Sequence, residues 1–165
     1  MGFLSNFGQN DVQQGGAGQA GAKPGENNMV RTETLRAILT MPVAIAAPDG
    51  ALDQATGAVL SRVLLSVPLL RAFGADEMKD LTDEILAEIA ERGADKVMRA
   101  GVSVMTMAER RLALRLAMEM SRDNPVFQIG DVLFLVEMQC AMGIREDEFS
   151  LLADAQGLFG TQSAA

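Results

Sequence analysis

The chain of 165 residues is 48% hydrophobic and 22% charged, and its formal net charge is −8. This length suits one domain, and the balance of apolar and charged residues is typical of a globular protein with its own core. The negative charge argues against a nucleic-acid partner, because binding to the phosphate backbone needs clustered Lys and Arg. The sequence contains no His, which excludes catalytic triads and His-based zinc sites. Ala, Leu, Met, Glu and Arg dominate while Trp and Tyr are absent, so the composition predicts an all-α fold.

The chain is predicted to divide into a flexible N-terminal tail with a short apolar tip, a helical domain and a disordered C-terminus, over residues 1–28, 29–160 and 161–165. Residues 8–28 are rich in Gly, Gln, Ala and Asn, which is typical of a flexible linker. Phe3, Leu4 and Phe7 share one side of the start, MGFLSNF, if it is helical. Two interpretations of this tip are open: a segment that docks on a membrane surface or a partner, and a frayed terminus. No run of apolar residues is long enough for a transmembrane helix, so we expect a soluble protein.

The first helix of the domain is expected in RTETLRAILTMPVAIAA, with an interruption at Pro42 because proline has no N–H to donate. A second helix is expected from Asp53, its predicted N-cap, to about Phe73. Pro68 should bend or end this second helix.

The stretch GADEMKDLTDEILAEIAERG is predicted to form an amphipathic helix that ends at Gly93. Its apolar residues recur at helical spacing: Met78, Leu81, Ile85 and Ile89. Its other side is acidic, with Asp76, Glu77, Asp80, Asp83, Glu84, Glu88 and Glu91. We interpret this side as a solvated face, with a binding patch as the alternative.

A short helix from Ala94 to about Met105 should come next. The following stretch, TMAERRLALRLAMEMSR, opens with Thr106 and Glu109 at the spacing of a capping box, in which each residue accepts from the other's backbone amide. Arg115 and Glu119 stand four residues apart and are expected to pair on the exposed side of this helix.

The stretch DVLFLVEMQCAMG is apolar nearly all round, which predicts the central helix of the core, ending at Gly143. Cys140 lies in this stretch and is interpreted as a buried apolar thiol rather than a redox group. As the single cysteine it excludes an intramolecular disulfide and favours a reducing compartment, the cytoplasm. A last helix from about Arg145 to Leu158 brings the bundle to about seven helices.

Several methionines fall on apolar helix faces: Met98, Met118, Met138 and Met142. They are interpreted as core filling, with a soft-metal site for Cu(I) as the alternative.

A weak internal duplication is visible when the chain is shifted by 74 residues. The shift aligns Asp49 with Asp123 and Leu60 with Phe134. A helix, an Asp turn and a second helix are therefore predicted to occur twice.

In its layout the chain resembles the tellurite-resistance TerB family. The likeness covers Pro42 to Phe149 and lies in the turn VAIAAPDGALD, the middle SVPLLRAFGADEMKDL, the turn LALRLAMEMSRDN and the tail GIREDEF. The resemblance implies a compact bundle of about seven helices, a role in tellurite or related stress responses, divalent cation binding at the acidic turns, and association with the inner face of the bacterial membrane.

The candidate metal ligands at these turns are Asp49, Asp53, Asp123 and Asp131. The family pattern has Asp-Gly with a Glu about seven residues on. Here Thr56 and Gly130 stand at the two Glu positions, and Asn124 replaces the second Gly. Because Ca²⁺ usually takes about six to eight oxygens, backbone carbonyls and water would have to complete the site. The alternative is that these residues are turn and N-cap residues, a role that Asp and Asn favour for local hydrogen-bonding reasons.

These observations favour a non-enzymatic, TerB-like stress-response module that binds protein partners and a divalent cation such as Ca²⁺ in the cytoplasm, near the inner membrane. The alternative hypothesis is a metal-free structural adaptor that acts through its helix faces and N-terminal tip. An enzyme ranks third, since no pair of carboxylates is arranged for acid–base chemistry and no small-molecule substrate is evident.

Overall fold

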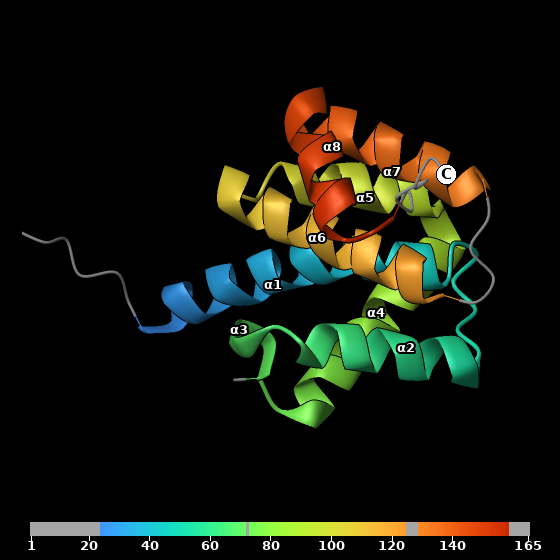
Figure 1. Cartoon of the computed structure of the whole chain (residues 1–165). Coiled ribbons are helices and arrows are strands. Elements are labelled where there is room, and N and C mark those ends of the chain that lie inside the picture. The colour runs from blue at the N-terminus through green and yellow to red at the C-terminus, as the bar shows by residue number, and fades with distance from the viewer. Residues whose placement is uncertain (1–23, 72, 125–128, 159–165) are drawn as a thin grey trace, which may run out of the picture.

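The computed structural model describes residues 24–71, 73–124 and 129–158, which form an all-α bundle (Figure 1). The described residues contain helices and their connections and no strand, so the predicted fold class is confirmed. The helices are α1 (Pro24–Ala46), α2 (Gln54–Leu65), α3 (Pro68–Arg71), α4 (Ala75–Arg92), α5 (Ala94–Val102), α6 (Met107–Asp123), α7 (Ile129–Met142) and α8 (Glu146–Ala155). Among them α3 is a single turn of four residues. No helix in this part of the chain is both long and apolar enough to cross a bilayer.

Helix α1 is the centre of the bundle, and it packs against α6, α5, α4 and α2. Its second half is almost fully buried, with Leu39, Met41 and Val43 at 0% exposure. Pro42 was expected to bend or end this helix, and it does not end it, because Pro42 lies inside one continuous helix. Proline costs a helix about 3 kcal/mol, and here helices on several sides hold the chain in helical form despite that cost. The helix begins at Pro24, earlier than the predicted domain boundary at residue 29.

Helix α7 was expected at the centre of the core, and this expectation is wrong. It packs against α6 and α5 only on one side, and its outer side leaves Leu133 61% and Val136 39% exposed. Cys140 is likewise exposed, so the prediction of a buried thiol is also wrong. A helix that is apolar on every side can pack against other helices on any of them. Its sequence does not show that neighbours cover every side.

The predicted helix ends are largely confirmed. Thr106 and Glu109 form the capping box of α6, and Asp53 is the N-cap of α2. Gly93 and Gly143 take positive φ angles of 85° and 67° where α4 and α7 end. Pro68 is the first residue of α3 and separates this helix from α2. The first position of a helix is the one at which proline is best tolerated.

The core combines branched aliphatic side chains with alanines and methionines. Met98, Met118, Met138 and Met142 are all buried, which confirms their role as core residues. A Cβ atom at Gly101 would lie 3.3 Å from the Cβ of Ala37. Glycine at this position therefore lets α5 approach α1 closely.

Helices α1 and α6 lie side by side and run in the same direction, so their C-terminal ends are at the same end of the bundle (Figure 1). The predicted order of helix, Asp turn and helix occurs twice, as α1–α2 and as α6–α7. The match is loose at the residue level. Asp49 stands three residues beyond α1, whereas Asp123 is the last residue of α6.

Candidate functional site

The first acidic turn, after α1, is shaped by its packing against α4. The carboxylate of Asp49 accepts a hydrogen bond of 3.0 Å from the amide of Ala51. Gly50 has a φ of +81°, and a Cβ there would lie 2.7 Å from both the backbone oxygen of Leu86 and the Cβ of Ala90. Only glycine fits this position, because any side chain would meet both a disfavoured backbone conformation and the α4 backbone. The Asp-Gly pair thus has a structural role whether or not an ion binds beside it.

Asp53 is engaged in capping α2. Its Oδ1 accepts hydrogen bonds from the amides of Ala55 and Thr56 over 2.9 and 3.0 Å. Its Oδ2 accepts one of 2.6 Å from the hydroxyl of Thr56. The bond from this hydroxyl is the main cause that lowers the pKa of Asp53. Thr56, which stands where the family pattern has Glu, is therefore a second capping residue here.

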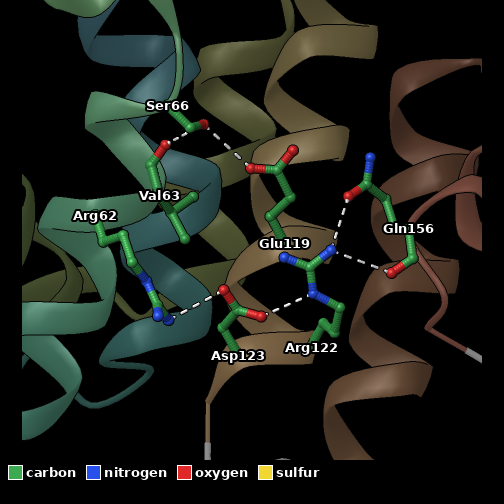
Figure 2. Close-up of polar contacts among 7 residues, drawn as sticks. All are labelled: Arg62, Val63, Ser66, Glu119, Arg122, Asp123 and Gln156. Carbon is green, nitrogen blue, oxygen red and sulfur yellow. Dashed lines mark hydrogen bonds and ion pairs between the residues drawn. The ribbon is translucent and has the colours of Figure 1, made fainter.

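Asp123 lies between two guanidinium groups (Figure 2). Arg62 on α2 donates to its Oδ2 over 3.0 Å, and Arg122 donates to its Oδ1 over 2.7 Å. The hydrogen bond from Arg122, together with the charges of both arginines, lowers the pKa of Asp123 below its usual value. Each carboxylate oxygen already has a cationic partner, so an incoming metal ion would compete with both arginines.

The same polar cluster joins α2, α6 and the end of α8 (Figure 2). Arg122 donates to the backbone oxygen of Gln156 over 3.3 Å. The hydroxyl of Ser66 lies 2.7 Å from the oxygen of Val63 and 3.3 Å from the carboxylate of Glu119. These polar contacts hold α2, α6 and the end of α8 together.

The fourth candidate ligand, Asp131, lies in α7, and its side chain is outside the described residues. Within the part of the chain that the structure describes, no group of three or more acidic or cysteine side chains is placed to hold a metal ion. Asp49, Asp53 and Asp123 each have a local hydrogen-bond partner instead. The cation site stays a prediction.

An apolar groove with a volume of about 530 Å³ lies between α2, α3 and α4. We call it the α2–α4 groove, and its main apolar lining is Leu52, Leu60, Leu64, Leu70, Phe73 and Met78. Leu65 at its edge is 60% exposed. This volume falls within the range of about 300–1,000 Å³ that is typical of pockets enclosing a drug-sized ligand. The groove can therefore hold several apolar side chains of a partner.

The α4 side of this groove is acidic. Lys79 and Asp83 line it and form an ion pair of 2.5 Å, and Asp76 and Asp80 are exposed beside them. The hydrogen bond to Asp83, and then the charges of Asp83, Asp80 and Asp76, raise the pKa of Lys79. On this side the cation of Lys79 is outnumbered, so the α4 rim of the groove is negatively charged. The guanidinium of Arg71 lies beside Leu65 at the edge of the groove, where it donates to the backbone oxygen of Leu65 over 2.6 Å.

Another part of the acidic face of α4 is not free for binding. Glu88 pairs with Arg36 of α1 and with Arg92, and its side chain is only 18% exposed. The hydrogen bond from Arg36 is the main cause that lowers the pKa of Glu88. The acidic face of α4 was predicted to be solvated, and the structure divides it into two parts. Near the C-terminal end of α4 it is paired with α1, and nearer the N-terminal end it forms the exposed acidic rim of the groove.

Neither the ties around Asp123 nor the α2–α4 groove was predicted from the sequence. Arg62 and Asp123 are 61 residues apart, and no local pattern connects them. The groove did leave a signal, because RVLLSVPLL holds more apolar residues than one buried helix side needs. Leu64 is 6% exposed while its neighbour Leu65 is 60% exposed.

Comparison of the chain with protein-family models, with curated proteins and with solved structures finds no match.

Proposed function

We propose that the chain is a non-enzymatic adaptor whose α2–α4 groove binds an amphipathic helix of a protein partner. The observation that carries this proposal is the apolar groove beside an acidic rim. An amphipathic helix places apolar residues on one side at spacings of three and four, and such a helix fits an apolar groove side-on. The acidic rim selects for Lys or Arg on the flank of that helix, through charge attraction that also speeds association.

The exposed Leu65 supports this proposal. Single exposed apolar residues are common on protein surfaces, so Leu65 alone means little. Here it borders a groove lined by seven other apolar residues, and a bound helix would cover it together with them. Anchor residues in such pockets carry most of the affinity of a helix-in-groove complex.

The TerB-like role in stress responses, and a location near the cytoplasmic membrane, remain part of this proposal on the sequence resemblance alone. We propose the metal-free form of the adaptor. The two arginines that hold Asp123 favour this form over cation binding. The C-terminal ends of α1 and α6 lie at the same end of the bundle, which favours cation binding (Figure 1).

A peptide titration tests the groove. The probe is a fluorescent amphipathic peptide with Leu at i, i+3, i+4 and i+7 and Lys on the opposite side, and a scrambled peptide of the same composition is its control. Leu65→Glu should weaken binding at least about tenfold, because it places a charge beside the apolar lining. Leu133→Glu on α7 is the matched control, since Leu133 is 61% exposed and Leu65 60%. Equal losses in both variants, or equal binding of the scrambled peptide, would refute the groove as the binding site.

Calorimetric titration of Ca²⁺, Mn²⁺ and Mg²⁺ into chelator-treated protein tests the metal-free form. We expect no heat of binding up to millimolar ion. Binding that disappears in an Asp49→Asn, Asp123→Asn double variant would instead show that the two turns share a cation.

A further inference from the structure

We propose that the chain's own N-terminal segment, residues 1–7, occupies the α2–α4 groove and competes there with the partner helix. This inference rests on the proposed function, because it concerns the regulation of the same site. The juxtaposition that carries it is an apolar groove with an acidic rim, within reach of an apolar segment on a Gly-rich tether.

The segment MGFLSNF has the apolar pattern that the lining of the groove would enclose, and it carries no Lys or Arg to pair with the acidic rim. Phe3, Leu4 and Phe7 stand at spacings of three and four, so a helix would bring all three to one side. A helix of this length is marginal alone in water, and docking in an apolar groove supplies the packing that it lacks. The two Phe rings bury about 150–250 Å² each when enclosed.

The segment also brings no opposing charge to the acidic rim of the groove. Its residues carry no acidic side chain, and the first one in the chain is Asp11. The carboxylates of Asp76, Asp80 and Asp83 at the rim therefore meet no like charge in residues 1–7. A desolvated carboxylate in the segment would have opposed docking.

The tether is long enough to reach. The chain enters α1 at Pro24, and Arg36 of α1 lies 4.0 Å from Glu84 of α4. Twelve helical residues from Pro24 to Arg36 rise about 18 Å, and the six from Glu84 back to Met78 in the groove about 9 Å. With about 14 Å for the two paired side chains, estimated from standard bond lengths, the path from Pro24 to the groove is at most about 41 Å. Sixteen residues of chain, 8–23, extend to about 53 Å.

The short tether favours the chain's own segment over a second copy. A short flexible linker gives its ligand an effective concentration in the millimolar range, far above the micromolar concentration of another molecule. If the segment binds with an intrinsic affinity of about 0.1 mM, an effective concentration of about 1 mM fills about nine tenths of the grooves. A partner helix then binds about tenfold more weakly than it does to a vacant groove.

Paramagnetic broadening in the full-length chain tests this arrangement. A nitroxide is attached at Ser5→Cys in a Cys140→Ser background, which is suitable because Cys140 is the single cysteine and is exposed. Methyl-labelled methionine then reports on Met78 in the groove and on Met138 in α7, which lies on the opposite side of the bundle from α2 and α3 (Figure 1). We expect strong broadening of the Met78 signal and little of the Met138 signal.

Matched variants assign the broadening to docking. Phe3→Ser with Phe7→Ser should abolish it, whereas Val12→Ser in the tether should leave it unchanged. On the groove side, Leu65→Glu should abolish it and Leu133→Glu should not. Equal broadening of Met78 and Met138, or broadening that survives the loss of both Phe rings, would overturn the proposal.

A mixed sample separates docking within one chain from docking between chains. Spin-labelled protein without the methyl label is mixed with methyl-labelled protein without the nitroxide. We expect no broadening of Met78 in this mixture. Broadening there would show that the segment binds a second copy, and the proposal would be wrong.

The peptide titration keeps this inference distinct from the proposed function. The Phe3→Ser, Phe7→Ser variant should bind the amphipathic peptide about tenfold more tightly than the unaltered chain. Peptide binding that depends on Leu65, without any broadening of Met78, would overturn only the inference. Broadening of Met78, with no peptide binding to the vacated groove, would overturn only the proposed function.

Discussion

At the scale of single residues, Gly50, Asp53 and Asp123 hold neighbouring helices and turns in place. The capping role of Asp53 could be predicted, because an N-cap depends on neighbours two and three residues away. The need for Gly50 could not, because it comes from Leu86 and Ala90 on another helix. The same holds for Asp123, whose partner Arg62 is distant in the sequence.

Gly50→Ala should destabilise the protein by about 2–4 kcal/mol, since it combines a left-handed backbone conformation with a collision against α4. Chemical denaturation measures this loss. Gly130→Ala is the control, because Gly130 is exposed in α7 with nothing near its Cβ position. That change should be neutral or stabilising by up to about 1 kcal/mol. A Gly50→Ala variant as stable as the unaltered chain would contradict the close packing of this turn on α4.

The ion pairs of Asp123 should appear in the pH dependence of stability. Its folded pKa is lowered, so its contribution is fully present above the unfolded value near 3.8 and is lost as the pH falls through the lower folded pKa. With its side chain 23% exposed, the contribution is about 1 kcal/mol or less. Asp123→Asn should therefore lower the free energy of unfolding at pH 7, and the difference should shrink towards pH 3. Urea unfolding at both values measures it, and a difference independent of pH would argue against the ion pairs as its source.

At the scale of helices, the sequence predicted where they lie and how several of them end, but not which one is central. Helical spacing, a capping box and the glycines are local signals, and they placed α4 and α6 well. Centrality depends on which surfaces are covered by distant parts of the chain. Helix α7 was more apolar in appearance than α1, yet α1 is the one enclosed.

Arg110 links the C-terminal ends of two helices, and no sequence pattern indicated this role. Its guanidinium donates to the backbone oxygens of Val102, Met105 and Met142, over 3.0, 3.1 and 2.9 Å. A cation at the C-terminal ends of α5 and α7 also interacts favourably with both helix dipoles. Arg110→Met should therefore cost about 2–4 kcal/mol, because it leaves three carbonyl groups without their partner.

Arg110→Lys should recover only part of this loss, since an ammonium group cannot reproduce the planar fork of the guanidinium. The neighbouring Arg111→Met is the comparison, because Arg111 makes a surface pair with Glu148 worth about 1 kcal/mol or less. Thermal and urea unfolding of the three variants measure the order of these losses. Equal stability of the Arg110 and Arg111 variants would argue against the tie.

The exposure of Cys140 predicts a thiol that reacts in the folded protein. A chromogenic disulfide reagent should modify one thiol per chain without denaturant, at a rate close to that after unfolding. Reaction only after denaturation would show that the outer side of α7 is covered.

At the scale of the whole molecule, we propose that the α2–α4 groove binds a partner and that the polar cluster at Asp123 supports the fold. Helix α1 holds the two regions in one core, because it packs against both α4 and α6. The all-α fold followed from composition and periodicity. The groove did not, because it arises where three helices meet, and the sequence offered only an excess of apolar residues in α2 and α3.

The most direct test of the groove as the binding site is the methyl signal of Met78 during titration of the amphipathic peptide into the Phe3→Ser, Phe7→Ser variant. Met107 is the internal control, since it is 39% exposed at the start of α6 and does not line the groove. We expect a saturable shift of the Met78 signal while the Met107 signal stays unchanged. A bound peptide that shifts Met107 and leaves Met78 unchanged would contradict this expectation.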